Sequence, residues 1–311
     1  MNTLVVLQQM LVLFAIMIIG YVCFKIAWLD KTSCGKLSRL VINVLNPMLI
    51  INGVINKETG NDYQKLLMNL LLMTIYFVIL ILLSFVVVRV LKIKGEQESL
   101  YRLMMIFSNV GFIGIPVISS IYGKTSVLYI AFYILGYNLL LYTYGLHLVG
   151  KSAGKPKGMK SFQAFVKEIA NPGVLACLIA IMLFAFRVRV PEPVETFVAY
   201  LGEPAVPMSM ILIGASMAQQ NLKAMFRNVK MYLFLFIRLL AIPVAAALIM
   251  GRLTVEAQIT GVFVLMLAMP VGSIVVLLAA QQGVDESCCT MGSILSTLFS
   301  VLTIPLVSLF L

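Results

Sequence analysis

The sequence is poor in the residues that enzymes and metal sites need. It contains one histidine, one tryptophan and twelve aspartates and glutamates, and charged residues of both signs make up only 11% of the chain. A catalytic Ser–His pair, a pair of catalytic aspartates and a His-Glu-x-x-His zinc motif are all missing. So is the Gly-x-x-x-x-Gly-Lys loop that binds nucleotide phosphates. We therefore expect neither an enzyme nor an ATP-driven pump in this chain.

The five cysteines follow no metal-site pattern and no disulfide framework. They are Cys23, Cys34, Cys177, Cys288 and Cys289. Most lie in apolar segments, where cysteine behaves as a small hydrophobic residue. We expect no bound metal and no cofactor. A membrane sensor is disfavoured too, because 311 residues leave no room for a soluble signalling domain beside the apolar segments.

Long apolar runs dominate what is present. Hydrophobic residues make up 61% of the chain, and the mean hydropathy is +1.05. A soluble domain is about one-quarter charged, so this composition is typical of an all-α polytopic membrane protein. Ten segments reach the roughly 20 apolar residues that a spanning helix needs, and none alternates as a barrel strand would. They are approximately 5–24, 37–55, 66–88, 103–122, 126–149, 172–190, 196–218, 231–250, 257–281 and 288–310. The first has no basic flank or cleavage site, so we expect a retained helix and not a signal peptide.

Lysines and arginines are distributed unevenly over the loops between these spans. If the N-terminus lies outside the cytoplasm, 17 of the 23 basic residues fall on the cytoplasmic side. The positive-inside rule then predicts a multi-pass protein of the cell (plasma or inner) membrane with both termini outside the cytoplasm. A net charge of +11 can also indicate nucleic-acid binding. That would need a basic face on a soluble domain, which this sequence does not offer.

A linker-like stretch divides the sequence into two halves. Residues 151–170 are rich in lysine and contain Gly154, Pro156 and Gly158. We predict a first five-helix repeat at residues 1–150, a cytoplasmic linker at 151–170 and a second five-helix repeat at 171–311. Because five is an odd number, the second repeat must be inverted in the membrane, as in many alternating-access transporters.

Prolines interrupt corresponding spans of the two halves. Pro47 lies in the second span, Pro204 and Pro207 lie in the seventh, and Pro116 and Pro270 lie in the fourth and ninth. Proline removes a backbone donor, and unwound backbone survives in a membrane only where it is buried or lines a cavity. A simple kink is the alternative at any single position. The matching pairs instead predict broken crossover helices 4 and 9, whose half-helix N-termini favour an anion near the bilayer midplane.

Three motifs and an early proline match a known family. They are Asn109 with Gly114-Ile115-Pro116, Met269-Pro270-Val271-Gly272, Leu212-Ile213-Gly214-Ala215-Ser216-Met217-Ala218, and Asn46-Pro47. With them, essentially the whole chain resembles the auxin efflux carrier family, which includes bacterial short-loop members and the plant PIN-type carriers. The resemblance implies a scaffold domain, a transport (crossover) domain and a small organic anion as substrate. The long hydrophilic loop of the plant carriers is missing, so regulation through that loop is not expected.

The candidate substrate site consists of polar, glycine and proline positions at the interruptions. We expect the substrate at Asn109, Gly111, Gly114, Pro116, Met269, Pro270, Gly272, Ser273, Asn46 and Asn138. An uncharged amide such as that of Asn109 can donate to a carboxylate without the desolvation cost of a charge. For Asn46 and Asn138 the alternative is hydrogen bonding between helices.

Glu203 and Arg238 are candidate coupling or gating residues, because ionisable groups at membrane depth are rare. A buried Glu203 could exchange a proton, and the alternative is an acid that stabilises a helix N-terminus. Arg238 could attract the substrate, or its long side chain could extend to the membrane surface.

These observations predict a secondary active transporter of a small carboxylate, such as malonate, malate or an auxin-like acid, working by alternating access. The alternative is a sodium-coupled organic-anion symporter of the bile-acid type. It is weakened because the second crossover has few of the Glu, Asn, Gln and Ser/Thr side chains that bind sodium. The lipid bilayer is the expected environment, and the sequence leaves open a coupling proton or sodium ion and a homodimer.

Overall fold

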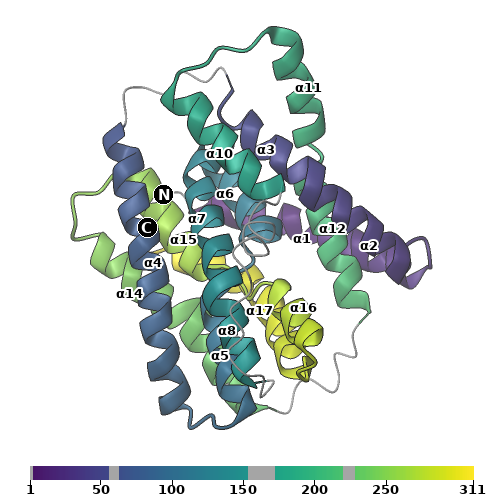
Figure 1. Ribbon diagram of the computed structural model, residues 1–311, viewed down its shortest axis with the longest axis vertical. Helices are drawn as coiled ribbons and strands as arrows, with labels where there is room; N and C mark the ends of the chain where they lie inside the picture. The colour runs from purple at the N-terminus through teal and green to yellow at the C-terminus, as the bar shows by residue number, and fades with distance from the viewer. Residues whose placement is uncertain (1–2, 56–62, 153–171, 220–227) are drawn as a thin grey trace. The chain divides into compact units, whose positions relative to one another are not determined.

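The computed structural model describes residues 3–55, 63–152, 172–219 and 228–311, which form helices joined by turns (Figure 1). Within these ranges the one β-type feature is a single antiparallel bridge between Ser108 and Val271. The prediction of an all-α protein is therefore confirmed. The predicted linker at 151–170 lies almost entirely outside the described residues.

The described chain contains seven helical segments that are long and apolar enough to cross a bilayer. They are Val6–Lys25, Lys31–Asn52, Gln64–Val90, Val127–Gly150, Glu192–Ala218, Val229–Met250 and Ser287–Ser308. Three shorter apolar segments, Val110–Tyr122, Pro172–Ala185 and Ala257–Ala268, lie in predicted spans 4, 6 and 9. The chain is thus a multi-pass helical membrane protein.

The chain folds into two compact units, and each takes segments from both halves of the sequence. The first comprises the described parts of Met1–Leu67, Val110–Leu135 and Ala170–Leu222. Its helices are α1 (Thr3–Lys25), α2 (Lys31–Leu40), α3 (Asn46–Asn52), α6 (Ile115–Tyr122), the first part of α7 (Val127–Leu140), α10 (Pro172–Ala185), α11 (Glu192–Gly202) and α12 (Ala205–Ala218).

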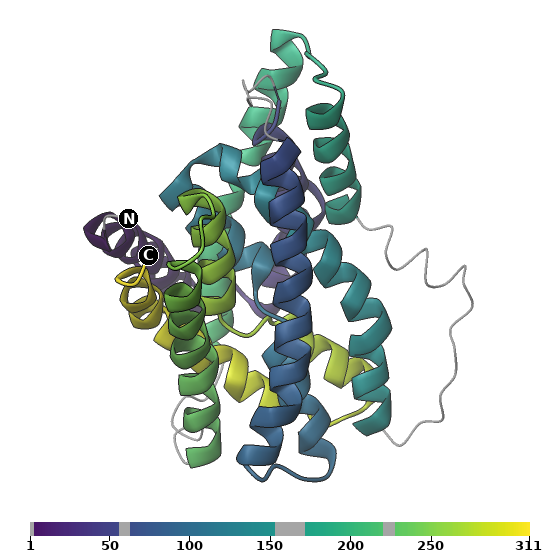
Figure 2. The ribbon, with the colours of Figure 1, turned by 90° about the vertical axis from the view of Figure 1, so that its left-hand side faces the viewer.

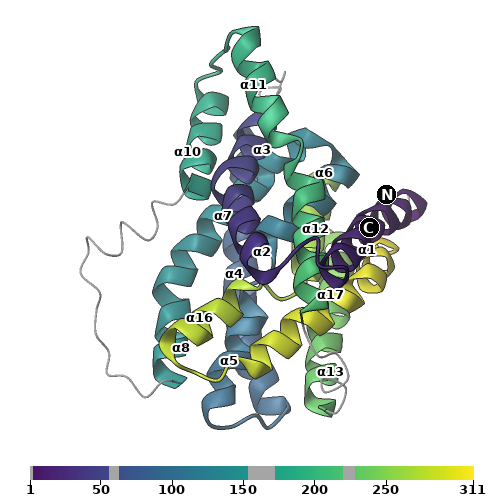
Figure 3. The ribbon, with the colours of Figure 1, turned by 90° about the vertical axis from the view of Figure 1, so that its right-hand side faces the viewer.

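Close backbone packing holds the first unit together. Helix α1 runs beside α12 (Figure 3). A side chain at Gly20 would overlap the Ile211 carbonyl, and one at Gly214 would overlap the Met17 carbonyl. Helix α3 packs against both α10 and α11. Its contact with α11 is equally close, because a Cβ on Gly202 of α11 would lie 2.9 Å from the Cα of Leu49 on α3. These contacts require glycine, since no side chain fits between the backbones.

The second unit comprises the described parts of Met68–Asn109, Gly136–Ile169 and Lys223–Leu311. Most of α4 (Tyr63–Val90) belongs to it, and with 28 residues this is the longest helix of the described chain (Figure 2). The others are α5 (Glu96–Ile106), α8 (Leu146–Ser152), α13 (Val229–Phe236), α14 (Ile242–Met250), α15 (Ala257–Ala268), α16 (Ile274–Gln282) and α17 (Ser287–Ser308). Helix α17 contacts α5, α13, α15 and α16, so it links most of this unit.

Polar side chains mark several helix starts. The Asp30 carboxylate accepts a hydrogen bond from the Ser33 N–H at 2.6 Å at the start of α2, and the Asn228 side chain accepts from the Met231 N–H at 3.3 Å at the start of α13. Such caps satisfy amides that have no partner in the first helical turn. The side chain and the N–H of Ser33 lower the pKa of Asp30, because both stabilise the carboxylate.

Wide π-type turns precede three of the prolines. Turns at Val41–Leu45, Val110–Gly114 and Ile237–Ala241 come directly before helices whose second residue is Pro47, Pro116 or Pro243. Proline lacks an N–H, and its ring clashes with the carbonyl four residues earlier. A wider turn absorbs that misfit without ending the helix.

The predicted interruptions are therefore only partly right. Pro47 does not break the second span, since the chain remains helical from Lys31 to Asn52. The stretch from Asn109 to Pro116, expected to be unwound, is also mostly helical, because Val110–Gly114 forms a π turn. The irregular backbone of the fourth span lies earlier, at Phe107–Asn109, where Phe107 has φ −100° and ψ 95°.

Candidate functional site

Two short non-helical segments of the second unit lie against each other. They are Phe107–Asn109, after α5, and Met269–Ser273, between α15 and α16, and we call them the crossing. The Asn109 N–H donates to the Pro270 carbonyl at 2.7 Å, and the Gly272 N–H donates to the Phe107 carbonyl at 2.9 Å. The crossing is thus a two-bond antiparallel bridge made by segments about 160 residues apart in sequence.

The bridge explains how irregular backbone is tolerated at this position. Backbone groups released at a helix end must find partners in a membrane protein. Proline donates no hydrogen bond, but the Pro270 carbonyl still accepts one. Gly272 is needed because a Cβ there would lie 2.9 Å from the Ser108 carbonyl oxygen.

Helix α17 supports the crossing through two serines. The Val271 N–H donates to the Ser296 Oγ at 3.0 Å, and the Ser293 hydroxyl donates to the Val271 carbonyl at 3.3 Å. The amides of Asn109, Val271 and Gly272 are therefore all engaged within the protein. These three amides are therefore not free to bind a ligand.

Arg238 connects the first segment of the crossing to the end of α15. Its side chain is fully buried (0% exposed) and belongs to the π turn before Pro243. The guanidinium donates to the Leu267 carbonyl, in the last turn of α15, and to the Ser108 hydroxyl oxygen. The Tyr76 hydroxyl lies 2.9 Å from the same Ser108 oxygen. The Arg238 Nε has no hydrogen-bond partner in the described chain.

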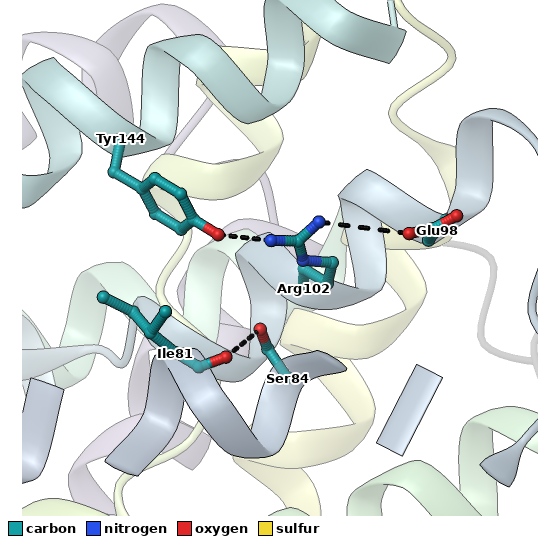
Figure 4. A network of polar contacts seen from close by, with 5 residues as sticks. All are labelled: Ile81, Ser84, Glu98, Arg102 and Tyr144. Atoms are coloured by element: carbon teal, nitrogen blue, oxygen red, sulfur yellow. Dashed lines mark hydrogen bonds and ion pairs between the residues drawn. The ribbon is translucent and has the colours of Figure 1, made fainter. Parts of the chain in front are cut away.

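The buried charges of the described residues are all positive. Arg102 and Arg238 are the two charged side chains in the buried class, and no described aspartate or glutamate is buried. Arg102 is partly compensated: its guanidinium donates to the Tyr144 hydroxyl and lies 3.9 Å from a Glu98 carboxylate oxygen (Figure 4). It also stacks on the Phe85 ring. Among the described residues Arg238 makes no ion pair.

The predicted substrate residues are divided between the two units. In the second unit Asn109, Met269, Pro270 and Gly272 are buried in the crossing and Ser273 is exposed. Asn138 is half-buried and follows Tyr137, whose ring packs edge-on against Phe107 at a centroid distance of 5.4 Å.

The first unit holds Asn46, Gly111, Gly114 and Pro116. There the amide nitrogen of Asn46 is 3.9 Å from the position that a Cβ on Gly111 would take. The structure thus brings Asn46 and Gly111 together, and separately it brings Asn109 together with Met269, Pro270 and Gly272.

Glu203 is exposed and follows the last residue of α11, Gly202. Burial of this carboxylate, on which the proton-exchange interpretation depended, is not observed. Arg238 does not extend to a surface, so the interpretation of its side chain as reaching the membrane interface is wrong. The sequence analysis also missed Tyr76, Ser108, Ser293 and Ser296. The hydroxyl residues of α17 do recur at helical spacing, and that periodicity was the available signal.

Comparison with known proteins decides the class of this molecule. A family model described as membrane transport protein matches residues 5–308. The chain belongs to the membrane transport protein family. It is 24% identical over 300 residues to an uncharacterised transporter of Methanothermobacter thermautotrophicus, with 96% of each chain covered. It is 23% identical over 311 residues to an uncharacterised transporter of Methanocaldococcus jannaschii, covering 96% of this chain and 97% of the relative.

Membership of the membrane transport protein family confirms the resemblance to the auxin efflux carriers. It also makes the molecule a transporter and not an enzyme, as its lack of catalytic residue pairs indicated. Two of the expected partners follow from this membership: the lipid bilayer and a transported substrate.

Proposed function

We propose that this transporter is a secondary active carrier of a small organic anion, a carboxylate such as malonate, malate or an auxin-like acid. The observation that carries the proposal is the crossing, where two interrupted helical segments pair through the Asn109–Pro270 and Phe107–Gly272 hydrogen bonds. Paired interruptions in the two halves of a membrane protein are typical of secondary transporters that bind their substrate at the midplane.

The fold that we propose has ten spans arranged as two inverted repeats, residues 1–150 and 171–311, joined by a cytoplasmic linker at 151–170. The seven long and three shorter apolar segments support it, because each predicted span overlaps one of them. The three short segments would cross with the help of the residues next to them, such as α5 before Val110–Tyr122 and α16 after Ala257–Ala268. We also propose a location in the cell membrane, and the positive-inside rule supports an orientation with both termini outside the cytoplasm.

The side chains at the crossing suit an anion better than a cation. Asn109 offers an amide donor, and helix α16 begins at Ile274, directly after Ser273, with the partial positive charge of a helix N-terminus. No described carboxylate is buried, so the interior offers no acidic side chain to a cation. The sodium-coupled alternative is therefore not favoured. We propose alternating access in which the unit that holds the crossing is the moving part.

A counterflow assay in proteoliposomes tests the substrate class. Purified protein is reconstituted with internal unlabelled acetate, benzoate, malonate, malate or indole-3-acetate, and uptake of the same labelled acid is followed with and without sodium and a pH gradient. We expect counterflow for at least one of these acids without a sodium requirement. Counterflow of none of them would contradict the carboxylate assignment, and a strict sodium requirement would restore the symporter alternative.

A further inference from the structure

We propose that Arg238 is the residue that makes the crossing selective for anions, acting through its charge and not through its hydrogen bonds alone. The inference rests on the proposed carboxylate transport and assigns the origin of its charge selectivity. The guanidinium is completely buried in the second unit. It bonds Ser108 of the first segment of the crossing and the Leu267 carbonyl in the last turn of α15, two residues before the second segment.

The C-terminal ends of α5 and α15 explain why a positive charge is needed beside the crossing. Helix α5 ends at Ile106 and α15 ends at Ala268, so both direct their C-termini toward the crossing. Each C-terminus carries about half a negative charge, so the two together carry roughly one. Without a cation nearby, these ends would favour a positive ligand. Arg238 offsets them, and the N-terminus of α16 then leaves the crossing with positive potential.

Acidic side chains do not cancel this positive potential. In the described part of the second unit, the five acidic residues, Glu96, Glu98, Glu256, Asp285 and Glu286, lie at or just before the N-terminal ends of α5, α15 and α17. At the α-helical rise of about 1.5 Å per residue, they are roughly 10–20 Å from the crossing along these helices, measured on α17 to Ser293, which bonds Val271. They are also outside the buried class, where solvent screens them. The field at the crossing therefore comes from Arg238, the helix ends and Arg102, whose charge Glu98 partly compensates.

The lack of a carboxylate beside Arg238 supports the same conclusion. The Nε atoms of Arg102 and Arg238 are both unpaired in the described chain, but Arg102 has Glu98 beside it, and an uncompensated buried charge is costly. No described acidic residue pairs with the Arg238 side chain. A negatively charged ligand supplies the missing compensation each time it binds.

The test compares ligands that differ in charge and little in shape. Malonate, monomethyl malonate and dimethyl malonate carry two, one and no negative charges at neutral pH, and indole-3-acetate with its methyl ester provides a bulkier pair. Their affinities are measured on the purified full chain for wild type and Arg238→Gln. We expect a loss of roughly tenfold for each negative charge on the ligand, and unchanged affinity for the neutral esters.

Three variants separate charge from structure. Arg238→Lys keeps the charge and should preserve the dependence of affinity on ligand charge. Ser108→Ala removes a hydrogen-bond partner of the guanidinium while the charge stays, and should preserve it too. Arg252→Gln removes an exposed arginine of the same unit and should change no affinity. If Arg238→Gln does not yield monodisperse protein, the Lys variant carries the test, and loss of charge dependence in that variant overturns the inference.

The remaining outcomes are equally decisive. An equal loss for charged and neutral ligands in Arg238→Gln would show a structural role alone and overturn the inference while leaving carboxylate transport intact. No change for any ligand would overturn it as well. If the wild type shows neither binding nor counterflow for any carboxylate of the panel, the proposed function fails, and the inference fails with it.

Discussion

At the scale of single residues, Asn109 combines a buried side chain with a backbone already fixed by the bridge. Its N–H is held by the Pro270 carbonyl, so replacing the side chain leaves the backbone hydrogen bond in place. The side chain is 8% exposed and stands directly before the π turn Val110–Gly114.

We expect Asn109→Ala to weaken carboxylate binding without lowering the yield or the melting temperature of the protein. A hydrogen bond to a charged group contributes about 1.5–3 kcal/mol, which corresponds to roughly ten- to a hundredfold in affinity. Asn109→Asp should bind more weakly still, because it sets a negative charge against an anion. Equilibrium binding of the acid identified by counterflow checks both variants. Wild-type affinity in both would place the anion site elsewhere.

Glu203 gives a second prediction at this scale. If this exposed carboxylate takes up the coupling proton, Glu203→Gln should abolish the dependence of transport on a pH gradient and leave counterflow intact, because counterflow needs no driving ion. Glu192→Gln, which changes another exposed acid of the first unit, serves as the control. Uptake measured with and without the gradient decides the question, and an unchanged pH response in a folded Glu203→Gln variant would end its role in coupling.

The important residues were only partly predictable from the sequence. Asn109 and Arg238 stand out because they are polar side chains within long apolar spans, where burial is costly without a role. Ser108 and Tyr76 do not stand out, because serine and tyrosine occur in many membrane helices. Their importance comes from contacts with partners 32 and 130 residues away in the sequence. A local pattern contains no information on such partners.

At the scale of helices, local chemistry predicted where segments are apolar better than where they are interrupted. Proline suggested unwinding up to Pro116, yet a π turn absorbs that proline. The extended backbone lies at Phe107–Asn109 because residues 270–272 pair with it there. The position of an interruption is therefore set by a distant segment as well as by the proline. The interruption predicted at Pro270 does contain this proline, because the non-helical segment is Met269–Ser273.

The packing of α1 on α12 yields a prediction for the stability of the first unit. Gly214→Ala places a Cβ against the Met17 carbonyl and 2.9 Å from the Tyr21 nitrogen, so the two helices must separate. Overpacking of this kind costs about 1–3 kcal/mol. We expect a lower thermal midpoint in detergent. Gly35→Ala, on α2, meets no atom within 4 Å and should instead be neutral or stabilising, because alanine favours helix. Equal midpoints for the two variants would contradict this packing.

At the scale of the whole molecule, the sequence and the structure divide the chain in different ways. The lysine-rich stretch and the odd number of spans divide it into two consecutive halves. The compact units instead each combine three separate segments, drawn from both halves. The two divisions are compatible if each half of the sequence contributes helices to a scaffold unit and to a transport unit. Sequence order alone cannot reveal the two units, because local composition does not record which helices of the two halves pack together.

The orientation in the membrane is the final prediction, and it rests on charge alone. The positive-inside rule places the turn between α4 and α5 in the cytoplasm and the turn between α14 and α15 outside it. Gln97 and Thr254 are exposed at these two places and carry no charge, so replacing them leaves the basic residues unchanged. In a background without the five native cysteines, Gln97→Cys should react with an impermeant maleimide only after the membrane is opened. Thr254→Cys should react in intact cells. The reverse pattern would invert the topology, while labelling of both sites from one side would contradict the odd number of crossings between them and with it the inverted repeat.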